Sequence, residues 1–351
     1  MEDTIRTWLA DEESRFIFDK RIEFMKHGDD RVFKEIIDKY VPELKDVFYY
    51  SGKEKKYLDN VKGKTWIYGG GVRGKKIISE LRENNIDVEG IIDRDISKAE
   101  VMGIPVFTVD EVDWKTIDSL IISMLDKQTA EDCFNKVVEL GMDEKNIILH
   151  REYDFIRLQD KQYFDELVRF HEGEIFVDAG VLDLSTSLLF ARKCNEYHIS
   201  DYKIFAFEPD NKSYERCINI KDKYPNINIE LRNCGLWSSN TVLGFDLLGN
   251  GSSHISEKEE INKINVVTLD SCVKEKVTYI KMDIEGAELE ALKGCKNIIR
   301  RYMPKLAISV YHKKEDIIEI PKFIKELMPE YKLYLRHYGN GELETVLYAL
   351  P

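Results

Sequence analysis

The sequence predicts an α/β protein in which a short helical segment precedes two domains, each built on a mostly parallel sheet. Short apolar segments of strand length alternate with helical segments over residues 61–150, and the alternation starts again at residue 175. Strands separated by helices indicate right-handed crossovers and parallel pairing. The length of 351 residues also exceeds one typical domain of ~100–200 residues. We therefore expect a helical segment at 1–60, one α/β domain at 61–150 and a second at 151–351.

The first 60 residues carry apolar side chains at helical spacing. Two such runs, Phe16–Met25 and Val32–Ile37, flank Gly28-Asp29-Asp30, whose aspartates are placed to cap the second helix. The residues of this segment suggest no chemistry. Residues 151–170 are polar and are also expected to be helical, as the link between the two α/β domains.

Each α/β domain is expected to contain at least five strands. The first domain has predicted helices at Val72–Asn85 and Ala130–Leu140, and predicted strands at Lys64–Tyr68, Val88–Ile92, Pro105–Phe107, Leu120–Met124 and Asn146–Leu149. The second domain has predicted strands at Ile175–Asp178, Ile204–Phe207, Ile227–Leu231, Tyr279–Met282, Leu306–Val310, Tyr331–Arg336 and Thr345–Leu350. Gly339-Asn340-Gly341 favours a hairpin turn, so the last two strands are expected to pair antiparallel.

Composition and charge narrow the classes of function. A formal net charge of -13 gives a surface that repels phosphate backbones, so nucleic acid is not an expected partner. The acidic start MEDTIRTWLADEESRF lacks the apolar segment of a secretory signal, and apolar runs such as Ile117–Leu125 are too short to span a bilayer. We therefore expect a cytoplasmic protein without membrane insertion. The six cysteines show no zinc-ligand spacing, which indicates reduced structural thiols. No metal cluster is evident in the sequence, although Asp283 and Glu285 could contribute to one.

A glycine-rich motif opens the first α/β domain. The run WIYGGGVRGKK, residues 66–76, contains Gly69, Gly71 and Gly74 as GxGxxG between a predicted strand and a predicted helix, and Asp93 ends the next strand. This context is typical of a Rossmann-like dinucleotide site, with NAD or a nucleotide sugar as candidate ligands. Similar Rossmann-like domains are found beside sugar-modifying enzymes. A degenerate structural domain, or one that forms a homodimer, remains the alternative.

A second group of residues lies at predicted strand ends after residue 170. Asp178 ends a strand, and Gly180 opens the turn before a helix, where backbone can approach a ligand. Glu208 ends the next strand, where a carboxylate can accept both ribose hydroxyls of a nucleoside, and Pro209 ends that strand. These four residues are the candidate cofactor-binding set. Helix capping and solvent-exposed carboxylates are the alternative explanations.

The segment YIKMDIEGAELEAL, residues 279–292, supplies further carboxylates. Asp283 and Glu285 end a buried strand, and Gly286 starts a helix. Alternation places both carboxylates on one face if the strand continues that far. Stabilisation of the helix N-terminus is the alternative role for these charges.

These residues resemble the FkbM family of methyltransferases over about residues 172–351. The resemblance rests on VDAG, FEPD, NCGLW, VVTLDS, IKMDIEGAE, ISVYHKKEDIIEIP, LRHY and ETVLYA. It implies a methyltransferase variant of the Rossmann fold with an antiparallel final strand, and S-adenosylmethionine as methyl donor. It also implies a sugar-like small-molecule acceptor that is methylated on a hydroxyl, as in polysaccharide biosynthesis.

The resemblance suggests roles for three residues and contains one departure. Asp283 is the first candidate for a base near the attacking hydroxyl, His312 is the second, and Glu285 is expected to position the substrate. Leu184 stands where the family usually has a second glycine, and its side chain is expected to crowd the methionine part of the donor. This departure supports a non-catalytic sensor or scaffold as one alternative. An NAD-dependent nucleotide-sugar oxidoreductase using Gly69–Gly74 and Asp93 is the other.

Overall fold

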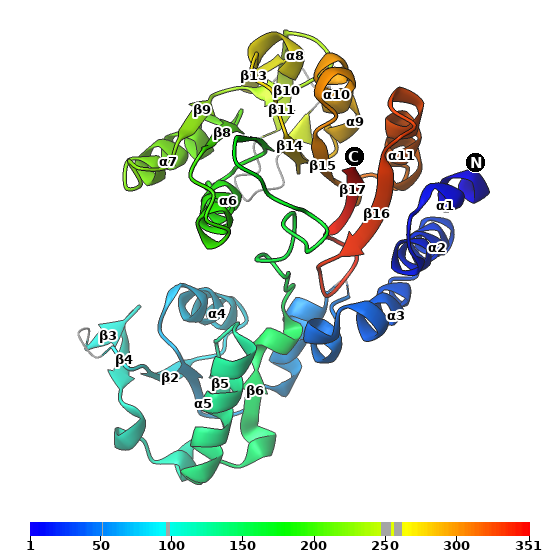
Figure 1. Ribbon diagram of the computed structural model, residues 1–351. Helices are drawn as coiled ribbons and strands as arrows, with labels where there is room; N and C mark the ends of the chain where they lie inside the picture. Colours follow the sequence, from blue (N-terminus) through cyan, green and yellow to red (C-terminus); the bar gives the residue numbers. More distant parts are fainter. Residues whose placement is uncertain (51, 96–98, 247–253, 256–261) are drawn as a thin grey trace. The chain divides into compact units, whose positions relative to one another are not determined.

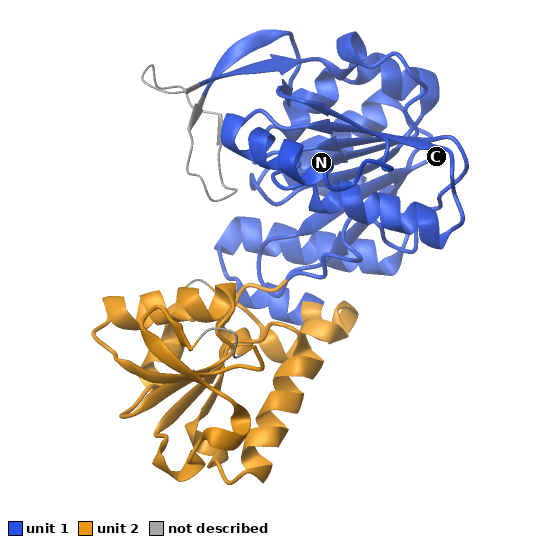
Figure 2. Ribbon diagram, turned by 90° about the vertical axis from the view of Figure 1, so that its left-hand side faces the viewer, with its two compact units in different colours: residues 1–36, 157–351 blue, residues 37–156 orange. Residues whose placement is uncertain are grey.

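The computed structural model describes all residues except 51, 96–98, 247–253 and 256–261. The described chain forms two compact units (Figure 2). Unit 1 contains residues 1–36 and 157–351, and unit 2 contains residues 37–156. This grouping differs from the division expected from the sequence, because residues 1–36 belong to the carboxyl-terminal unit.

Unit 2 is a Rossmann-like layer structure around a six-stranded sheet with the order β3-β4-β2-β1-β5-β6. All neighbouring strands pair parallel except β3 and β4, which pair antiparallel. The strands are β1 (Thr65–Tyr68), β2 (Val88–Ile92), β3 (Glu100–Val101), β4 (Ile104–Phe107), β5 (Ser119–Ile122) and β6 (Ile147–Leu149). The helices are α4 (Val72–Glu83), α5 (Lys127–Glu139) and six 3-10 segments, η1 (Pro42–Val47), η2 (Lys53–Asn60), η3 (Val109–Glu111), η4 (Trp114–Thr116), η5 (Glu144–Asn146) and η6 (His150–Tyr153).

Alternation along the strands of unit 2 gives the sheet two apolar faces. Ile121 of β5 packs in one buried cluster with Ile77 of α4. Leu120 of β5 packs in another cluster with Ala130 and Val137 of α5. Since successive side chains of a strand point to opposite faces, the two helices cover opposite sides of the sheet. The predicted parallel strand–helix architecture is therefore confirmed.

Unit 1 is built on a seven-stranded sheet with the order β16-β17-β15-β14-β7-β8-β9 (Figure 1). Its strands are β7 (Glu174–Ala179), β8 (Tyr202–Phe207), β9 (Ile229–Arg232), β14 (Tyr279–Met282), β15 (Lys305–Ser309), β16 (Lys332–His337) and β17 (Thr345–Leu350). The final strand β17 lies antiparallel between β15 and β16, whereas the remaining neighbours pair parallel. The prediction of a methyltransferase-type sheet with an antiparallel final strand is thus confirmed.

The helices of unit 1 and a second small sheet complete the unit. The helices are α1 (Glu2–Trp8), α2 (Glu12–His27), α3 (Arg31–Tyr40, which crosses the boundary to unit 2), α6 (Ser185–Glu196), α7 (Asn211–Lys221), α8 (Leu269–Cys272), α9 (Glu288–Lys293), α10 (Lys296–Tyr302) and α11 (Asp316–Leu327). The small sheet has the order β10-β13-β11-β12, formed by Gly235–Leu236, Asn262–Val267, Thr241–Asp246 and His254–Ile255. The sequence analysis did not predict this sheet. No helix among the described residues is both long enough and apolar enough to cross a bilayer.

The amino-terminal helices cover the edge strand β16. Leu9 forms a parallel bridge with Leu333, and Ser14 Oγ accepts a hydrogen bond of 2.9 Å from the backbone N–H of Leu335. Figure 1 shows α2 running alongside β16. An edge strand exposes unpaired backbone N–H and C=O groups, and these contacts provide hydrogen-bond partners for some of the groups of β16. This packing explains why residues 1–36 group with the carboxyl-terminal sheet.

Residues 151–170 do not form the predicted helix. After η6 the chain continues as turns, with one isolated bridge between Arg157 and Gly339. Tyr163 and Phe164 of this segment are buried in the core cluster of unit 1, where Phe164 lies 5.9 Å from Phe176, centroid to centroid. Burial of large aromatic side chains within the sheet's core therefore determines the path of this segment, rather than local helix propensity.

Candidate functional site

The loop between β7 and α6, residues 180–184, approaches the end of β14 very closely. Gly180 has a φ of 81°, and a Cβ there would collide with the carbonyl oxygen of Asp283. Glycine is therefore required at this position for both its backbone conformation and the space it leaves. We call this segment the donor loop.

Leu184 lies in the donor loop, but its side chain packs into the core. It has a φ of 60°, a left-handed conformation that glycine adopts more easily, and its exposure is 0%. It belongs to the apolar cluster that also contains Phe190 and Cys217. The expected crowding of a ligand by this side chain is therefore not what the structure shows, because the side chain is directed into the protein interior.

Asp178 is fully buried beneath the donor loop. Its Oδ1 forms an ion pair of 3.0 Å with Lys281 Nζ, and its Oδ2 accepts a hydrogen bond of 2.7 Å from Ser187 Oγ. Lys281 Nζ also donates to the carbonyl oxygens of Ala179 (3.1 Å) and Gly180 (2.9 Å). Two contacts of the ammonium group therefore hold the backbone at the start of the loop, and its third contact is the ion pair with Asp178. The sequence analysis missed Lys281, although a lysine within a fully buried strand was a signal of an internal partner.

Glu208 lies at the end of β8 and contacts the donor loop. Its Oε2 accepts a hydrogen bond of 2.9 Å from the backbone N–H of Leu182, and its Oε1 accepts one of 2.8 Å from Asp210. Burial raises the pKa of this carboxyl. A carboxylate oxygen can accept more than one hydrogen bond, so both oxygens keep acceptor capacity. Pro209 follows directly, and Asp210 then caps α7 through the backbone N–H of Ser213.

Asp283 follows β14 and is held by two tyrosine hydroxyls. Tyr163 donates to Oδ2 at 2.7 Å, and Tyr311 donates to Oδ1 at 3.0 Å. Burial alone would raise the pKa of Asp283, but the charges of His312 and Lys281 and the two hydrogen bonds bring it below its usual value. Asp283 therefore stays ionised.

Glu285 does not share a strand face with Asp283, because β14 ends at Met282. Its φ of 55° is unusual for a residue other than glycine, and such strain is found mainly at functional sites. Its carboxylate lies 3.6 Å from His312 Nε2. Burial raises the pKa of Glu285 to about 7, and Asp283 and Glu288 add to this while His312 opposes it.

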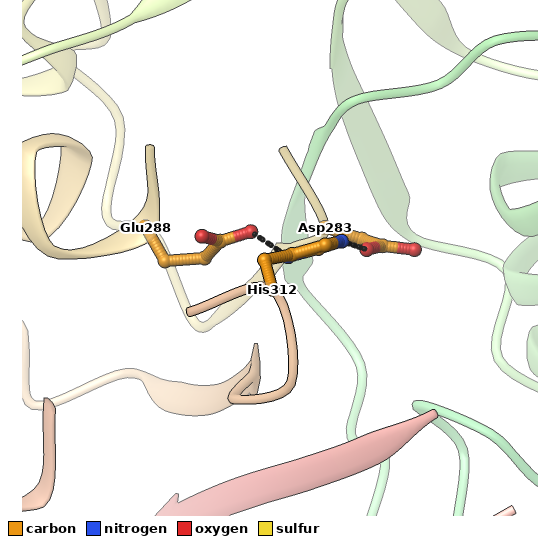
Figure 3. Close-up of side chains that lie close together, drawn as sticks. All are labelled: Asp283, Glu288 and His312. Carbon is orange, nitrogen blue, oxygen red and sulfur yellow. Dashed lines mark ion pairs between the residues drawn. The ribbon is translucent and has the colours of Figure 1, made fainter. Parts of the chain in front are cut away.

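His312 lies between two carboxylates of the segment that follows β14, those of Asp283 and Glu288 (Figure 3). Its Nε2 is 3.3 Å from Asp283 Oδ1, and its Nδ1 is 2.9 Å from Glu288 Oε1. Burial would lower the pKa of His312, but Glu288, Asp283 and Glu285 together raise it to about 9. Glu288 was missed by the sequence analysis, since a glutamate at a helix start is locally explained by the helix dipole.

The groups around His312 are also suited to hold a cation. Asp283, Glu288 and His312 each offer one ligand atom, and these atoms lie within 4.8 Å of one another. We call these three residues, with Glu285, the Asp283 cluster. It brings together the three predicted catalytic residues, Asp283, Glu285 and His312, at the carboxyl ends of β14 and β15.

The glycine-rich loop of unit 2 also has the local geometry that its motif predicts. Gly69 has a φ of 103°, and a Cβ at Gly74 would collide with the carbonyl oxygen of Gly69. A Cβ at Gly71 would have no heavy atom within 4 Å. Asp93 Oδ2 accepts a hydrogen bond of 2.7 Å from the backbone N–H of Gly70, so this carboxylate supports the loop.

Comparison with known proteins agrees with the topology and with the motifs. Residues 177–340 match the Methyltransferase FkbM domain family. Over 192 residues the chain is 29% identical to the hexuronic acid methyltransferase AglP of Haloferax volcanii. The aligned region covers 53% of this chain and 71% of that protein. The fold is similar to the crystal structure of Methyltransferase FkbM from Methylobacillus flagellatus KT, with a TM-score of 0.51 and a sequence identity of 19%. The superposition covers 90% of this chain and 97% of that chain. These similarities identify the chain as a methyltransferase, and the match to the FkbM domain model extends over residues 177–340.

Proposed function

We propose that this methyltransferase transfers a methyl group to a hydroxyl of a sugar or a related small molecule. The family implies S-adenosylmethionine as the donor, and a relative is named a hexuronic acid methyltransferase. When bound, the sulfonium supplies a methyl group that is already activated for attack by oxygen. The protein then has to orient the two reactants and accept a proton.

The observation that carries this proposal is the meeting of three loops at one edge of the sheet. The strands β8, β7 and β14 are neighbours, so Glu208, Gly180 and Asp283 lie at adjacent carboxyl ends. Ligands of open α/β sheets bind outside these ends. The absent Cβ of Gly180 and the remaining acceptor capacity of Glu208 fit a nucleoside there.

Each predicted cofactor-binding residue has a distinct part in this proposal. Glu208 would accept the ribose hydroxyls, and Pro209 would end the strand beside them. Gly180 would let the donor loop approach the ligand. Asp178 would act from beneath the loop, through Lys281 and Ser187, because its side chain is fully buried.

Titration calorimetry with S-adenosylmethionine and its demethylated product tests the donor site. Replacing Glu208 with Gln should weaken binding by about 1–3 kcal/mol, because hydroxyls that bonded a carboxylate lose a charged acceptor. Glu215→Gln, on the exposed side of α7, is the matched control and should leave affinity unchanged. Equal affinity of the wild type and the Glu208 variant would remove Glu208 from the site.

The acceptor class requires a separate experiment. Purified chain, donor and a panel of free hexuronic acids, hexuronic-acid oligosaccharides and neutral sugars should give methylated product, measured by mass spectrometry. We expect methyl ethers on sugar hydroxyls. Methyl esters or methylated amines as the only products would contradict the hydroxyl assignment while leaving the methyltransferase activity in place.

A nucleotide or nucleotide sugar is the proposed ligand of unit 2. The specific support is the open space at Gly71, next to the start of α4. NAD remains the other candidate ligand, and a purely structural domain is the alternative. Calorimetric titration of the full chain with NAD and with a uridine-diphosphate sugar separates these three outcomes.

A further inference from the structure

We propose that the Asp283 cluster binds one divalent transition-metal ion of the Mn²⁺ or Zn²⁺ class. The ligands would be Asp283, Glu288 and one ring nitrogen of His312, with Glu285 at the open side. This inference deepens the methyl transfer proposed above and rests on it for its catalytic meaning. The binding itself can be measured without any reaction.

The donor atoms of Asp283, Glu288 and His312 lie close enough together to bind one ion. The three ligand atoms lie within 4.8 Å of one another and come from two segments that converge at one sheet edge (Figure 3). Atoms that bind one ion at ~2.0–2.2 Å lie at most about 4.4 Å apart, so small side-chain movements suffice.

Two buried atoms of the cluster have no hydrogen-bond partner among the described residues. These atoms are His312 Nδ1 and Glu288 Oε2. The His312 side chain is 10% exposed and the Glu288 side chain is fully buried. Nδ1 lies 2.9 Å from Glu288 Oε1 in an ion pair, but the two atoms do not form a hydrogen bond. Buried polar atoms are normally paired, and an ion would supply the missing partner.

The cluster carries more negative charge than positive charge. Asp283, Glu285 and Glu288 place three carboxylates around a single imidazole. Asp316 of α11 adds a fourth carboxylate, which interacts electrostatically with Glu288 and His312. The nearby Lys281 is already paired with Asp178. An imidazolium offsets only one of these negative charges, whereas a divalent ion offsets two.

Two tyrosines support Asp283 as outer partners. Tyr163 and Tyr311 each donate to one of its oxygens and thereby fix the orientation of the carboxylate. Ligating carboxylates are commonly held by such second hydrogen bonds. Imidazole together with carboxylates favours transition ions over Mg²⁺ or Ca²⁺, which prefer all-oxygen sites.

The position of the cluster gives the ion a role with the acceptor. It follows β14 and β15, one strand away from the donor loop on β7. A metal-bound hydroxyl loses its proton more readily than a free one. In the transfer, the acceptor oxygen forms a bond to the methyl carbon, and the carbon–sulfur bond breaks with its electron pair left on sulfur. The hydroxyl proton passes to Glu285 or to water.

Binding is tested on the full chain by titration with MnCl₂, using calorimetry and electron paramagnetic resonance. We expect one Mn²⁺ per chain, with Mg²⁺ and Ca²⁺ at least tenfold weaker in competition. Asp283→Asn and His312→Gln should each weaken Mn²⁺ binding at least tenfold. Tyr311→Phe should weaken it less, because an outer hydrogen bond is lost while the ligands remain. Glu290→Gln, on the same helix as Glu288 but paired with Lys293, is the matched control and should bind normally.

A second measurement needs no variant. In protein labelled with ¹⁵N-histidine, one equivalent of Zn²⁺ should shift the ring nitrogens of His312 and leave those of exposed His27 unchanged. No saturable Mn²⁺ binding, or Zn²⁺ without effect on His312, would overturn the proposal and leave His312 as an imidazolium held by carboxylates. Donor binding is titrated separately, with and without EDTA. A chain that methylates sugars in EDTA refutes the metal site alone, and a chain that binds Mn²⁺ but no donor refutes the proposed function alone.

Discussion

The two glycine loops of this chain have the same local plan but differ in what supports them. In unit 2, Asp93 accepts the backbone N–H of Gly70 at 2.7 Å, and in unit 1 Glu208 accepts that of Leu182 at 2.9 Å. Each acid ends the strand next to its loop. The two loops differ in the group that supports them from the strand on the other side. In unit 2, Ser123 follows β5, and its neutral hydroxyl donates a hydrogen bond of 3.1 Å to the carbonyl oxygen of Gly69. The corresponding strand β14 supplies the buried ammonium of Lys281.

The difference continues beyond the strand ends. After β14 the chain provides Asp283, Glu285 and Glu288, which converge on His312. After β5 the next acid is Asp126, which caps α5 through the backbone N–H of Thr129. A Rossmann-like loop with its acid is therefore enough to suggest binding. Groups that can handle protons or a cation at the neighbouring strand end distinguish the unit that carries out chemistry.

The largest difference in stability is expected from the groups that hold the two loops, Lys281 in unit 1 and Ser123 in unit 2. Lys281→Met should lower the free energy of unfolding by about 3–5 kcal/mol, since it leaves Asp178 as an uncompensated buried charge. Ser123→Ala should cost only about 1 kcal/mol, the typical net value of a neutral hydrogen bond. Urea denaturation of the full chain measures both.

The paired variant Lys281→Met with Asp178→Asn serves as the control for this prediction. It removes both charges and should recover part of the lost stability. A single Lys281→Met variant as stable as Ser123→Ala would break the comparison, because the two loops would then be supported equally.

A smaller effect is expected within the donor loop itself. Leu184→Gly should destabilise the protein by about 2–4 kcal/mol, because the loss of a buried leucine outweighs the relief of its left-handed backbone. Leu182 has a φ of 44° and is 40% exposed, so Leu182→Gly should be neutral or slightly stabilising. Thermal unfolding distinguishes the two variants. Equal effects would mean that Leu184 is not packed in the core.

Lowering the pH should reduce the stability of both units over the same pH range. Burial lowers the pKa of His150 in unit 2 and of His337 in unit 1 to about 3. Both are neutral when folded but take up a proton below about 6.5 when unfolded. Above pH 6.5 they therefore leave the free energy of unfolding unchanged, and as the pH falls toward 3 each lowers it by up to about 1.4 kcal/mol per pH unit. His337→Gln should flatten this dependence in denaturation experiments at pH 4 to 7, whereas His27→Gln, at an exposed position, should not.

The smallest effect is expected from Gly71→Val. A Cβ at this position meets no heavy atom within 4 Å, so the variant should fold normally. S-adenosylmethionine binding should remain at the wild-type level, because the donor is assigned to unit 1. Any ligand held by the glycine-rich loop of unit 2 should be lost. Reduced donor binding in calorimetry would mean that the donor is bound by unit 2 instead.

Local patterns in the sequence were sufficient for the two main sheets, but they did not reveal the four-stranded small sheet of unit 1. The strand–helix alternation, the glycine turns and the antiparallel final hairpin were predicted, because periodicity and turn residues act over a few neighbouring positions. The acids at strand ends were found for the same reason. Residues 151–170 were the main error, since their path follows from burial of Tyr163 and Phe164 in a core made elsewhere in the chain.

The tertiary structure decided which of these residues meet. Tyr163 and Asp283 are 120 positions apart in the chain, yet their side chains form a hydrogen bond of 2.7 Å. The pairing of Lys281 with Asp178 and of His312 with Glu288 likewise depends on the order of strands in the sheet. Spacing along the chain identified candidate residues at strand ends. Only the packing of distant segments determines which charges share a buried site, because electrostatic partners are set by distance in space and by the water that folding removes.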